Sequence, residues 1–485
     1  MFFQQKDHNP KDYAMSRIVS ASHQNISIQL LEHRWPGFKP VAEYFKGEIH
    51  CIRLIPYKTE SRCPHCGQMC VRRHARQDRV LWDMPLIAYG RLKLICEIHR
   101  YRCDKCHHTH AQQPSFAEVR SRLTHAMVYY AQSLMRVVSC SLKDVQQLTG
   151  LSSPTLKHLD KEQLKYCYEN INLKGVHNLA IDEFSVHKGH KYATVVLDND
   201  TCRVLWIGKG KSRSSVQPFF DLLKDQGVAE NIQSVACDQN AAYPSLVKDN
   251  LPNAAIVYDL FHVMKHWRDD VLLPAKRKAQ DAAVENAVKT LTEGGKTCDA
   301  KTLSVAKNTA RKSMSGADWV LITPLESIPE DKRAQRKKML ERMTQDNALL
   351  AALYPLAESL RRLWKEKSRE KAAGTIQHIR TLLLEIARTY DFRPARNFAS
   401  MLQRRHTGII DAGHFGFTTN RLEGANNKIK VIKRIGYGFR DLDYFFLKIK
   451  SALPGTYALT LFDKLRGYAV IKGHPVDLRA GCCPV

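Results

Sequence analysis

Two pairs of closely spaced cysteines place the tightest local constraint on how this chain can fold. Cys63 and Cys66 stand in CPHC, and Cys103 and Cys106 stand in CDKC. Two such C-x-x-C pairs can bring four thiolates to one tetrahedral Zn²⁺ ion. Short strand-like runs lie between them, and so small a segment buries too little surface to fold without the metal. We therefore predict a closed structural zinc site in residues 51–116, the alternative for a single C-x-x-C being a redox pair.

The charge balance indicates a polyanionic partner. The 485 residues include 75 Lys and Arg against 48 Asp and Glu, a formal net charge of +27. A chain this basic, with no apolar run as long as a membrane span, most often binds nucleic acid. A ribosomal or merely very soluble protein is the alternative, but few of these are so long. The sequence begins without an apolar signal segment, so the 14 cysteines are expected in a reducing, cytoplasmic setting.

Residues 141–160, SLKDVQQLTGLSSPTLKHLD, have the pattern of a helix-turn-helix motif. The apolar spacing predicts a first helix that ends at Gly150, and Ser152 or Ser153 then caps a second helix. In such motifs the start of the second helix enters the major groove of DNA. The candidate DNA contacts are therefore Ser153, Thr155, Lys157 and His158. An ordinary helical hairpin has the same pattern, but the basic charge and the neighbouring cysteine segment favour DNA binding.

Residues 176–260 alternate between strands and helices. Three runs joined by short polar turns, LAIDEFSV, KYATVVLDND and CRVLWIGKG, predict an antiparallel meander. Asp182 lies in the first run and Asp238 ends a later apolar strand, although an unpaired carboxylate is costly in a strand core. Two acids in such positions suggest bound divalent cations. Because side chains alternate along a strand, Glu183 is expected on the face opposite Asp182.

Helical signals dominate the rest of the chain. From about residue 260 to residue 406 the strand signals disappear and amphipathic helices follow. A further helix is predicted in TTNRLEGANNKIKVIKR, with Leu422, Ala425, Ile429 and Ile432 on one face. A second face carries Glu423, Asn427, Lys430 and Arg434. A carboxylate beside such residues suits a metal ligand next to a phosphodiester, and a solvated charged face is the alternative.

Taken together, these motifs resemble those of DDE insertion-sequence transposases of the ISL-three family. The family pattern N-x-x-E-G-x-N-x-x-I-K-x-x-K-R-x-x-x-G-F is matched by Asn420, Glu423, Gly424, Asn426, Ile429, Lys430, Lys433, Arg434, Gly438 and Phe439. The family's first acid lies in a segment like AIDEF, here Asp182, and its second in a segment like CDQNAAY, here Asp238. A D-x-F-H segment is matched by Asp259, Phe261 and His262. The resemblance covers roughly residues 50–455.

The resemblance implies a multidomain architecture: a zinc ribbon, an all-α helix-turn-helix domain, and an α/β RNase H-like catalytic core interrupted by an all-α insertion. The expected domains are an N-terminal lead-in at 1–50, a zinc-binding domain at 51–116, a helix-turn-helix domain at 117–172, the first part of the core at 173–264, the insertion at 265–410, the last part of the core at 411–455 and a tail at 456–485.

The resemblance also implies DNA transposition by a homodimer in the bacterial cytoplasm, associated with the nucleoid. Hydrolysis at the transposon end frees a 3′-OH, which then attacks target DNA. Two Mg²⁺ (or Mn²⁺) ions are expected on Asp182, Asp238 and Glu423. Asp259 is the main rival for the second acid, and it is expected to support the site together with His262, for which a core histidine is the alternative.

DNA-backbone contacts are expected from Asn427, Lys430, Lys433 and Arg434, on the helix that carries Glu423. Two other functions fit the motifs less well. A zinc-ribbon regulator with a decayed nuclease body would be expected to lack one of the acids or the last helix. A structure-specific RNase H-like nuclease would cut DNA without joining it.

Overall fold

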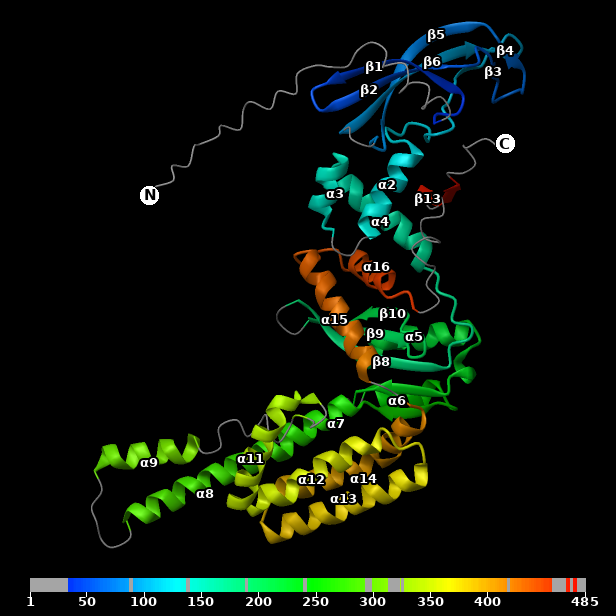
Figure 1. Ribbon diagram of the computed structural model, residues 1–485. Coiled ribbons are helices and arrows are strands. Elements are labelled where there is room, and N and C mark those ends of the chain that lie inside the picture. Colours follow the sequence, from blue (N-terminus) through cyan, green and yellow to red (C-terminus); the bar gives the residue numbers. More distant parts are fainter. Residues whose placement is uncertain are drawn as a thin grey trace, which may run out of the picture. The chain divides into compact units, whose positions relative to one another are not determined.

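The computed structural model describes residues 34–86, 90–136, 140–187, 191–238, 242–292, 299–312, 323, 327–416, 419–455, 468–471 and 474–477 (Figure 1). Two compact units divide the chain. The first unit takes its residues from 1–170, 432–451 and 459–485, and the second takes them from 171–431 and 452–458. Each unit therefore combines segments that are far apart in the sequence.

The first unit contains a five-stranded sheet in which β1, β2, β6 and β5 lie in that order and β7 pairs with β6. β2 and β6 are parallel, and the other pairs are antiparallel. The strands are β1 (Phe38–Lys46), β2 (Ile49–Pro56), β5 (Arg73–Asp83), β6 (Arg91–Arg102) and β7 (Thr109–Ala111), and a separate small hairpin consists of β3 (Ser61–Arg62) and β4 (Met69–Cys70). Alternate residues of β6 pack into one core, namely Leu92, Leu94, Cys96 and Ile98.

The lead-in predicted at residues 1–50 is too long, because residues 34–50 belong with this sheet. Trp35 and Phe38 are each 2% exposed and lie in the same core as Leu81. The indole nitrogen of Trp35 also donates a 2.9 Å hydrogen bond to the buried carboxylate of Asp83. β1 is an edge strand that is mostly exposed after Pro40, so its sequence lacks the alternation by which half-buried strands are recognised.

Three helices follow the sheet: α2 (His125–Arg136), α3 (Leu142–Thr149) and α4 (Ser153–Tyr168). Ser141 and Asp144 form a capping box at the start of α3, which ends at Gly150 in the left-handed region with φ of 70°. Ser152 caps α4 from an extended conformation. The two helices and their turn thus lie where the sequence predicted them.

Helix α16 (Leu442–Ala452) lies against α4, in the first unit rather than with the segment 411–455 to which we assigned it. Asp160 of α4 is 1% exposed, and its carboxylate accepts a 2.5 Å hydrogen bond from the Tyr444 hydroxyl and pairs with Lys448 Nζ at 3.1 Å. Burying these polar groups is favourable only when they pair with one another, so α16 packs on α4. Strands β13 (Tyr468–Ile471) and β14 (His474–Asp477) form a further antiparallel pair in this unit.

The second unit contains a five-stranded sheet in the order β10, β9, β8, β11 and β12. The predicted antiparallel meander is formed by β8 (Asn178–His187), β9 (Lys191–Asp198) and β10 (Val204–Lys209). β8 and β11 (Ser234–Cys237) are parallel, as are β11 and β12 (Ala255–Tyr258). Helices α5 (Arg213–Asp225) and α6 (Ala242–Asn250) cover one face, where Leu179 and Ile181 of β8 pack with Phe219 and Tyr243. A short 3₁₀ turn at Ala229–Asn231 precedes β11.

No strand occurs among the described residues between 260 and 416, as predicted. The helices are α7 (Leu260–His266), a π-helical segment (Trp267–Leu272), α8 (Leu273–Thr292), α9 (Ala300–Lys312), α11 (Glu330–Asp346), α12 (Ala348–Leu363), α13 (Arg369–Thr389) and α14 (Arg393–His414). α12, α13 and α14 lie side by side (Figure 1). α14 also approaches β12 closely at Gly408, where an added Cβ would lie 2.6 Å from the Tyr258 ring.

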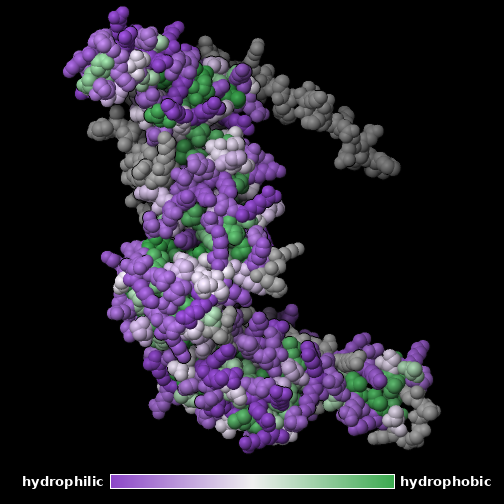
Figure 2. Space-filling view, turned by 180° about the vertical axis from the view of Figure 1, so that it is seen from behind, coloured by the Kyte–Doolittle hydropathy of each residue, from purple (hydrophilic) through white to green (hydrophobic). Residues whose placement is uncertain are grey.

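Helix α15 (Thr419–Ile435) contacts the face of this sheet opposite α5 and α6, because it reaches Asp182, an even-numbered residue of β8. Its apolar face is the predicted one, with Leu422, Ala425, Ile429 and Ile432 buried. Within the described part of the chain, no helix has both the length and the apolar character needed to cross a membrane. Hydrophilic side chains cover most of the visible surface, in keeping with the large charge (Figure 2).

Candidate active site

The parallel register of the second sheet brings three acids to one edge. It aligns three residues on neighbouring strands, Ile181, Cys237 and Tyr258. The next residue on each strand is an acid: Asp182, Asp238 and Asp259. Because the strands run parallel, these acids follow at the same level of the sheet. Two acids that the sequence singled out separately thus become neighbours, with the rival Asp259 on the strand beyond.

The carboxylate of Asp182 is partly buried and hydrogen-bonded on both oxygens. One oxygen accepts from the side-chain amide of Asn426 at 2.5 Å, and the other accepts from the backbone N–H of Glu183 at 2.7 Å. Burial raises the pKa of Asp182, and the nearby charge of Asp238 raises it further, whereas the two hydrogen bonds lower it. Asp182 is therefore a carboxylate that a neighbouring positive charge would stabilise in its ionised form.

Asp238 is paired with His262. The distance from His262 Nδ1 to Asp238 Oδ1 is 3.2 Å, and both side chains remain partly exposed. His262 lies in the first turn of α7, three residues after Asp259, so the predicted D-x-F-H segment does bring its histidine to the acids. His262 is also close enough for its charge to lower the pKa of Asp182. The structure thus groups Asp182, Asp238 and His262 at one edge of the sheet.

Arg405 of α14 is a neighbour of this group that the sequence analysis missed. Its guanidinium carbon lies 5.7 Å from the centre of the Tyr258 ring. Burial lowers the pKa of Arg405, while the charge of Asp238 acts in the opposite direction. Arg405 stands in a helix with many other basic residues, so no local pattern distinguishes it. Only the packing of α14 on β12 brings this arginine near the acids.

Glu423 lies on α15 one turn before Asn426, with an exposed side chain. In the described residues Asp182, Asp238 and Glu423 do not bring ligand oxygens within 4.8 Å of one another. On α15 it is Asn426, and not Glu423, that is hydrogen-bonded to Asp182. Asn426 belongs to the family pattern, but the predicted contact to DNA was that of Asn427. Asn427 is exposed, and its amide oxygen accepts a hydrogen bond from Lys430 at 3.4 Å.

Glu183 lies on the opposite face from Asp182, as predicted. Its carboxylate accepts a 2.9 Å hydrogen bond from the Tyr243 hydroxyl on α6 and lies 3.3 Å from Lys211 Nζ. Tyr243 in turn lies 3.2 Å from the Thr194 hydroxyl of β9. This network lies on the side of the sheet that α5 and α6 cover, so Glu183 supports the strand that carries Asp182 without joining the acids.

The four predicted cysteines of the first unit form a cluster. The sulfur atoms of Cys63, Cys66, Cys103 and Cys106 all lie within 4.8 Å of one another. The two C-x-x-C turns match: Gly67 N–H donates to the Cys63 carbonyl at 3.0 Å, and His107 N–H donates to the Cys103 carbonyl at 2.9 Å. Both donors have positive φ, 73° and 57°. Backbone N–H groups, that of Cys106 above all, lower the pKa of the Cys103 thiol to about 6 and favour its thiolate, whereas burial and the three neighbouring thiols raise the pKa of Cys106.

Comparisons with known proteins identify the family of this chain. The profile of a transposase family, the DDE type of ISL3 elements, matches residues 179–449. The transposase of insertion sequence element IS1001 from Bordetella parapertussis is 31% identical over 409 residues, which is 84% of this chain and 93% of that protein. The chain belongs to this transposase family. It is a DNA transposase, an enzyme, and its family is one that uses divalent metal ions.

Two further transposases are more distantly similar to this chain. The transposase of element IS1557 from Mycobacterium tuberculosis is 27% identical over 263 residues, covering 54% of this transposase and 56% of its own length. A solved strand transfer complex of the Drosophila P element transposase aligns with 71% of this transposase and 94% of its own chain, at 9% identity and a TM-score of 0.28.

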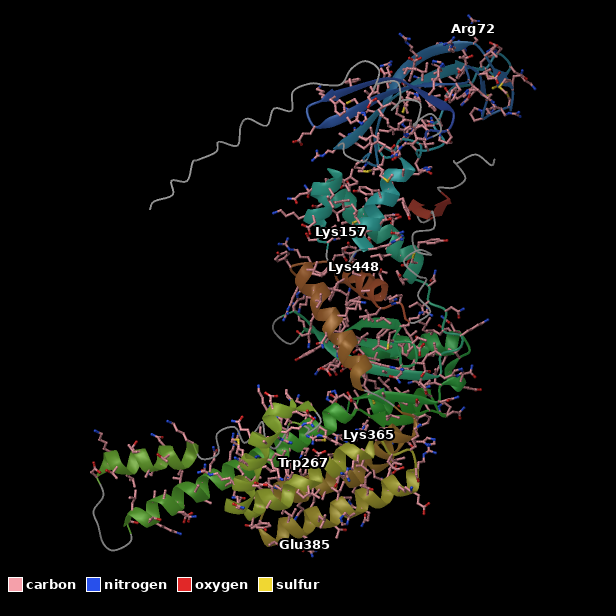
Figure 3. All side chains as sticks on the ribbon, viewed as in Figure 1. Arg72, Lys157, Trp267, Lys365, Glu385 and Lys448 are labelled. Atoms are coloured by element: carbon pink, nitrogen blue, oxygen red, sulfur yellow. The ribbon has the colours of Figure 1, made fainter. Side chains whose placement is uncertain are left out.

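The predicted DNA-contact residues of α4 differ in their surroundings. The Ser153 hydroxyl donates to Gln146 at 2.6 Å, and the Thr155 hydroxyl lies 2.9 Å from that of Ser152. Lys157 pairs with Asp441 at 3.0 Å and lies over the Tyr444 ring, on the side of α4 that faces α16 (Figure 3). His158 is exposed. Of the candidates, Lys157 is thus the one paired with a residue outside the two helices of the motif.

The basic residues predicted on α15 are mostly at the surface. Lys430 and Arg434 are exposed, and Lys433 is half-buried. These cations and Asn427 recur at three- and four-residue spacing, so they lie on one side of the helix. They remain predicted contacts to the DNA backbone.

Proposed function

We propose that this transposase binds the terminal inverted repeats of its insertion sequence, hydrolyses a phosphodiester at each end, and joins the freed 3′-OH to target DNA. The alignment of Asp182 with Asp238, together with the contact from Asn426 of the signature helix to Asp182, carries this proposal. The strand register and this hydrogen bond bring the segments that carry Asp182, Asp238 and Glu423 close together in the second unit.

The proposed metal ligands are Asp182, Asp238 and Glu423, for two Mg²⁺ or Mn²⁺ ions. The donor set fits hard cations, which prefer carboxylate and amide oxygens. A further feature favours the fit: the amide oxygen of Asn426 is buried without a hydrogen-bond partner, beside the Asp182 carboxylate. When bound at such a site, a divalent cation supplies Lewis acidity for displacement at phosphorus.

The chain's own residues have distinct tasks in this proposal. Asn426 orients the Asp182 carboxylate, and the pairing with His262 orients Asp238. Asp259 remains a supporting acid, since Asp238 lies on the strand next to Asp182 and Asp259 lies one strand further away. The positive charge of Arg405 offsets part of the repulsion among the acids.

The proposed architecture follows the sequence prediction with two changes. The strand order β10-β9-β8-β11-β12, with a meander followed by parallel strands, supports an RNase H-like core, and the helices α8 to α14 support an insertion between Asp238 and Glu423. The sheet with the cysteine cluster is proposed as a zinc-ribbon domain that begins at residue 34, and α16 is added to the helix-turn-helix domain. The other boundaries are retained.

The proposal also includes one zinc ion on the four cysteines, a homodimer that pairs two ends, and a nucleoid location in the bacterial cytoplasm.

Incubating the full chain with duplexes that carry its own element's ends, target DNA and Mg²⁺ tests this function. Both cleaved ends and joined products are expected. Cleavage without joining would indicate a nuclease, and binding without cleavage would indicate a regulator. Either result would contradict the proposal.

A further inference from the structure

A pocket of the first unit lies where the sheet meets the helix-turn-helix. Its volume is about 540 Å³, and it is lined by Arg91, Lys143, Gln146, Gln147 and Ser153. Arg91 begins β6, the next three residues lie on α3, and Ser153 begins α4. Two lining residues are cations and none is acidic, so the pocket presents positive charge and hydrogen-bond donors. An anionic, oxygen-rich ligand fits this lining.

The turn of the motif shapes one wall of the pocket. Gly150 has φ of 70°, and an added Cβ there would lie 2.6 Å from the guanidinium carbon of Arg91. The absence of a side chain at Gly150 therefore lets Arg91 lie across the turn. The hydrogen bond from Ser153 to Gln146 links the two helices beside it. The acid of α3, Asp144, accepts hydrogen bonds from Ser141 in the capping box and does not line the pocket.

We propose that this pocket binds a backbone phosphate of the transposon-end duplex, with Arg91 and Lys143 as its cations. The inference rests on the proposed function, in which the start of α4 meets the major groove. Ser153 belongs both to that start and to the pocket lining, so DNA that engages α4 passes over the pocket. Arginine binds phosphate oxygens through paired N–H groups. A strand of the sheet thereby becomes part of the DNA-contact surface, and its contact positions the motif on the duplex.

The affinity of full-length Arg91→Ala for a duplex carrying the element's own terminal repeat tests this proposal. We expect about tenfold weaker binding than wild type and a slope of log affinity against log salt that is smaller by about 0.9, as for one lost phosphate contact. Arg100→Ala is the matched control, since Arg100 is an exposed arginine on the same strand and does not line the pocket. It should keep the wild-type slope. Equal slopes for wild type, Arg91→Ala and Lys143→Ala would overturn the proposal.

Methylphosphonate substitution of single phosphates locates the contact. One neutral position should weaken wild-type binding about tenfold and leave the affinity of Arg91→Ala unchanged. If every position weakens both proteins equally, Arg91 contacts no phosphate and the proposal fails. Lys143→Ala, a change on the exposed side of α3, provides the same test if Arg91→Ala does not fold. Failure of the wild type to prefer its own ends would contradict the proposed function instead, whereas wild-type preference with unchanged variants would contradict only the pocket.

Discussion

The side-chain amide of Asn426 donates a 2.5 Å hydrogen bond to the carboxylate of Asp182, a residue 244 positions earlier in the chain. This contact connects the helix that carries Glu423 to the strand that carries the first acid. The other amide atom, the oxygen, is buried without a partner. Asn426 is therefore positioned both to orient Asp182 and to interact with a cation or water beside it.

Replacing Asn426 by Ala should slow end cleavage about tenfold at neutral pH, equivalent to about 1.4 kcal/mol. In the wild type, the hydrogen bond from Asn426 favours the ionised form of Asp182. Without it, the pKa of Asp182, already raised by burial, should rise further. The proposed active form is ionised, and activity is therefore lost as the pH falls through this pKa. The loss should begin at a higher pH in the variant, which single-turnover cleavage across a pH series measures. Asn427→Ala should keep the wild-type acidic limb, and an unshifted limb in Asn426→Ala would contradict the role.

Replacing Glu423 by Gln should lower cleavage and joining by orders of magnitude while end binding persists. The change keeps size and removes one negative ligand, and the buried face of α15 is untouched. Asp182→Asn and Asp238→Asn should behave alike in single-turnover assays with Mg²⁺.

Glu183→Gln is the matched control on the same strand, because Gln can still accept the hydrogen bond from Tyr243. It should retain activity. If Asp259→Asn abolishes chemistry and Asp238→Asn does not, the second acid is Asp259. Wild-type joining by Glu423→Gln would disprove the assignment of the triad.

Replacing Cys103 by Ser should remove most of the bound zinc. We expect about one equivalent in wild-type protein purified without added zinc, since structural sites of this kind close with four ligands. Loss of the metal should also lower the unfolding temperature of the first unit, because the binding energy contributes to folding. Cys167→Ser, which changes an exposed cysteine outside the cluster, should keep the metal. Full zinc content in Cys103→Ser would rule out the four-cysteine site.

Replacing His158 by Ala should reduce the preference for the element's own ends while affinity for unrelated duplex survives. Exposed His158 lies in the first turns of α4, where such motifs contact bases. Lys157→Ala should have a smaller effect on specificity and should lower the unfolding temperature, because Lys157 pairs with Asp441. Competition binding with specific and random duplexes measures the specificity of both variants, and thermal unfolding measures the stability of Lys157→Ala. An equal loss of affinity on the two duplexes for His158→Ala would count against a recognition helix.

Replacing Gly408 by Ala should destabilise the second unit, whereas Gly374→Ala should not. A Cβ at Gly408 would lie 2.6 Å from the Tyr258 ring and 2.8 Å from the Ile256 carbonyl oxygen, so α14 would have to move away from β12. Gly374 lies in α13 with nothing within 4 Å of an added Cβ. Alanine there should stabilise the helix by about 0.5–1 kcal/mol. Thermal unfolding of both variants compares them, and equal unfolding temperatures would show that α14 does not pack closely on β12.

Local chemistry made several parts of this protein predictable. The ends of α3 and α4 follow from caps at Ser141 and Ser152 and from the glycine at 150, each of which acts within one turn. The meander follows from alternating apolar runs with short polar turns, and the four cysteines follow from their spacing. The edge strand β1 was missed because only one end of it is buried, which leaves little apolar alternation to read.

By itself the sequence predicted the family, the candidate acids and the cysteine cluster, because these depend on residue identity and on spacings of a few positions. Only the tertiary structure decided that Asp182 and Asp238 are neighbours, that Asn426 rather than Asn427 meets Asp182, and that Arg405 lies near Asp238. It also decided that α16 packs on α4 through Asp160 and Lys448. Each of these relationships joins segments distant in the chain. Strand register and the burial of helix faces bring such segments together, and no local spacing encodes which distant surface a face will meet.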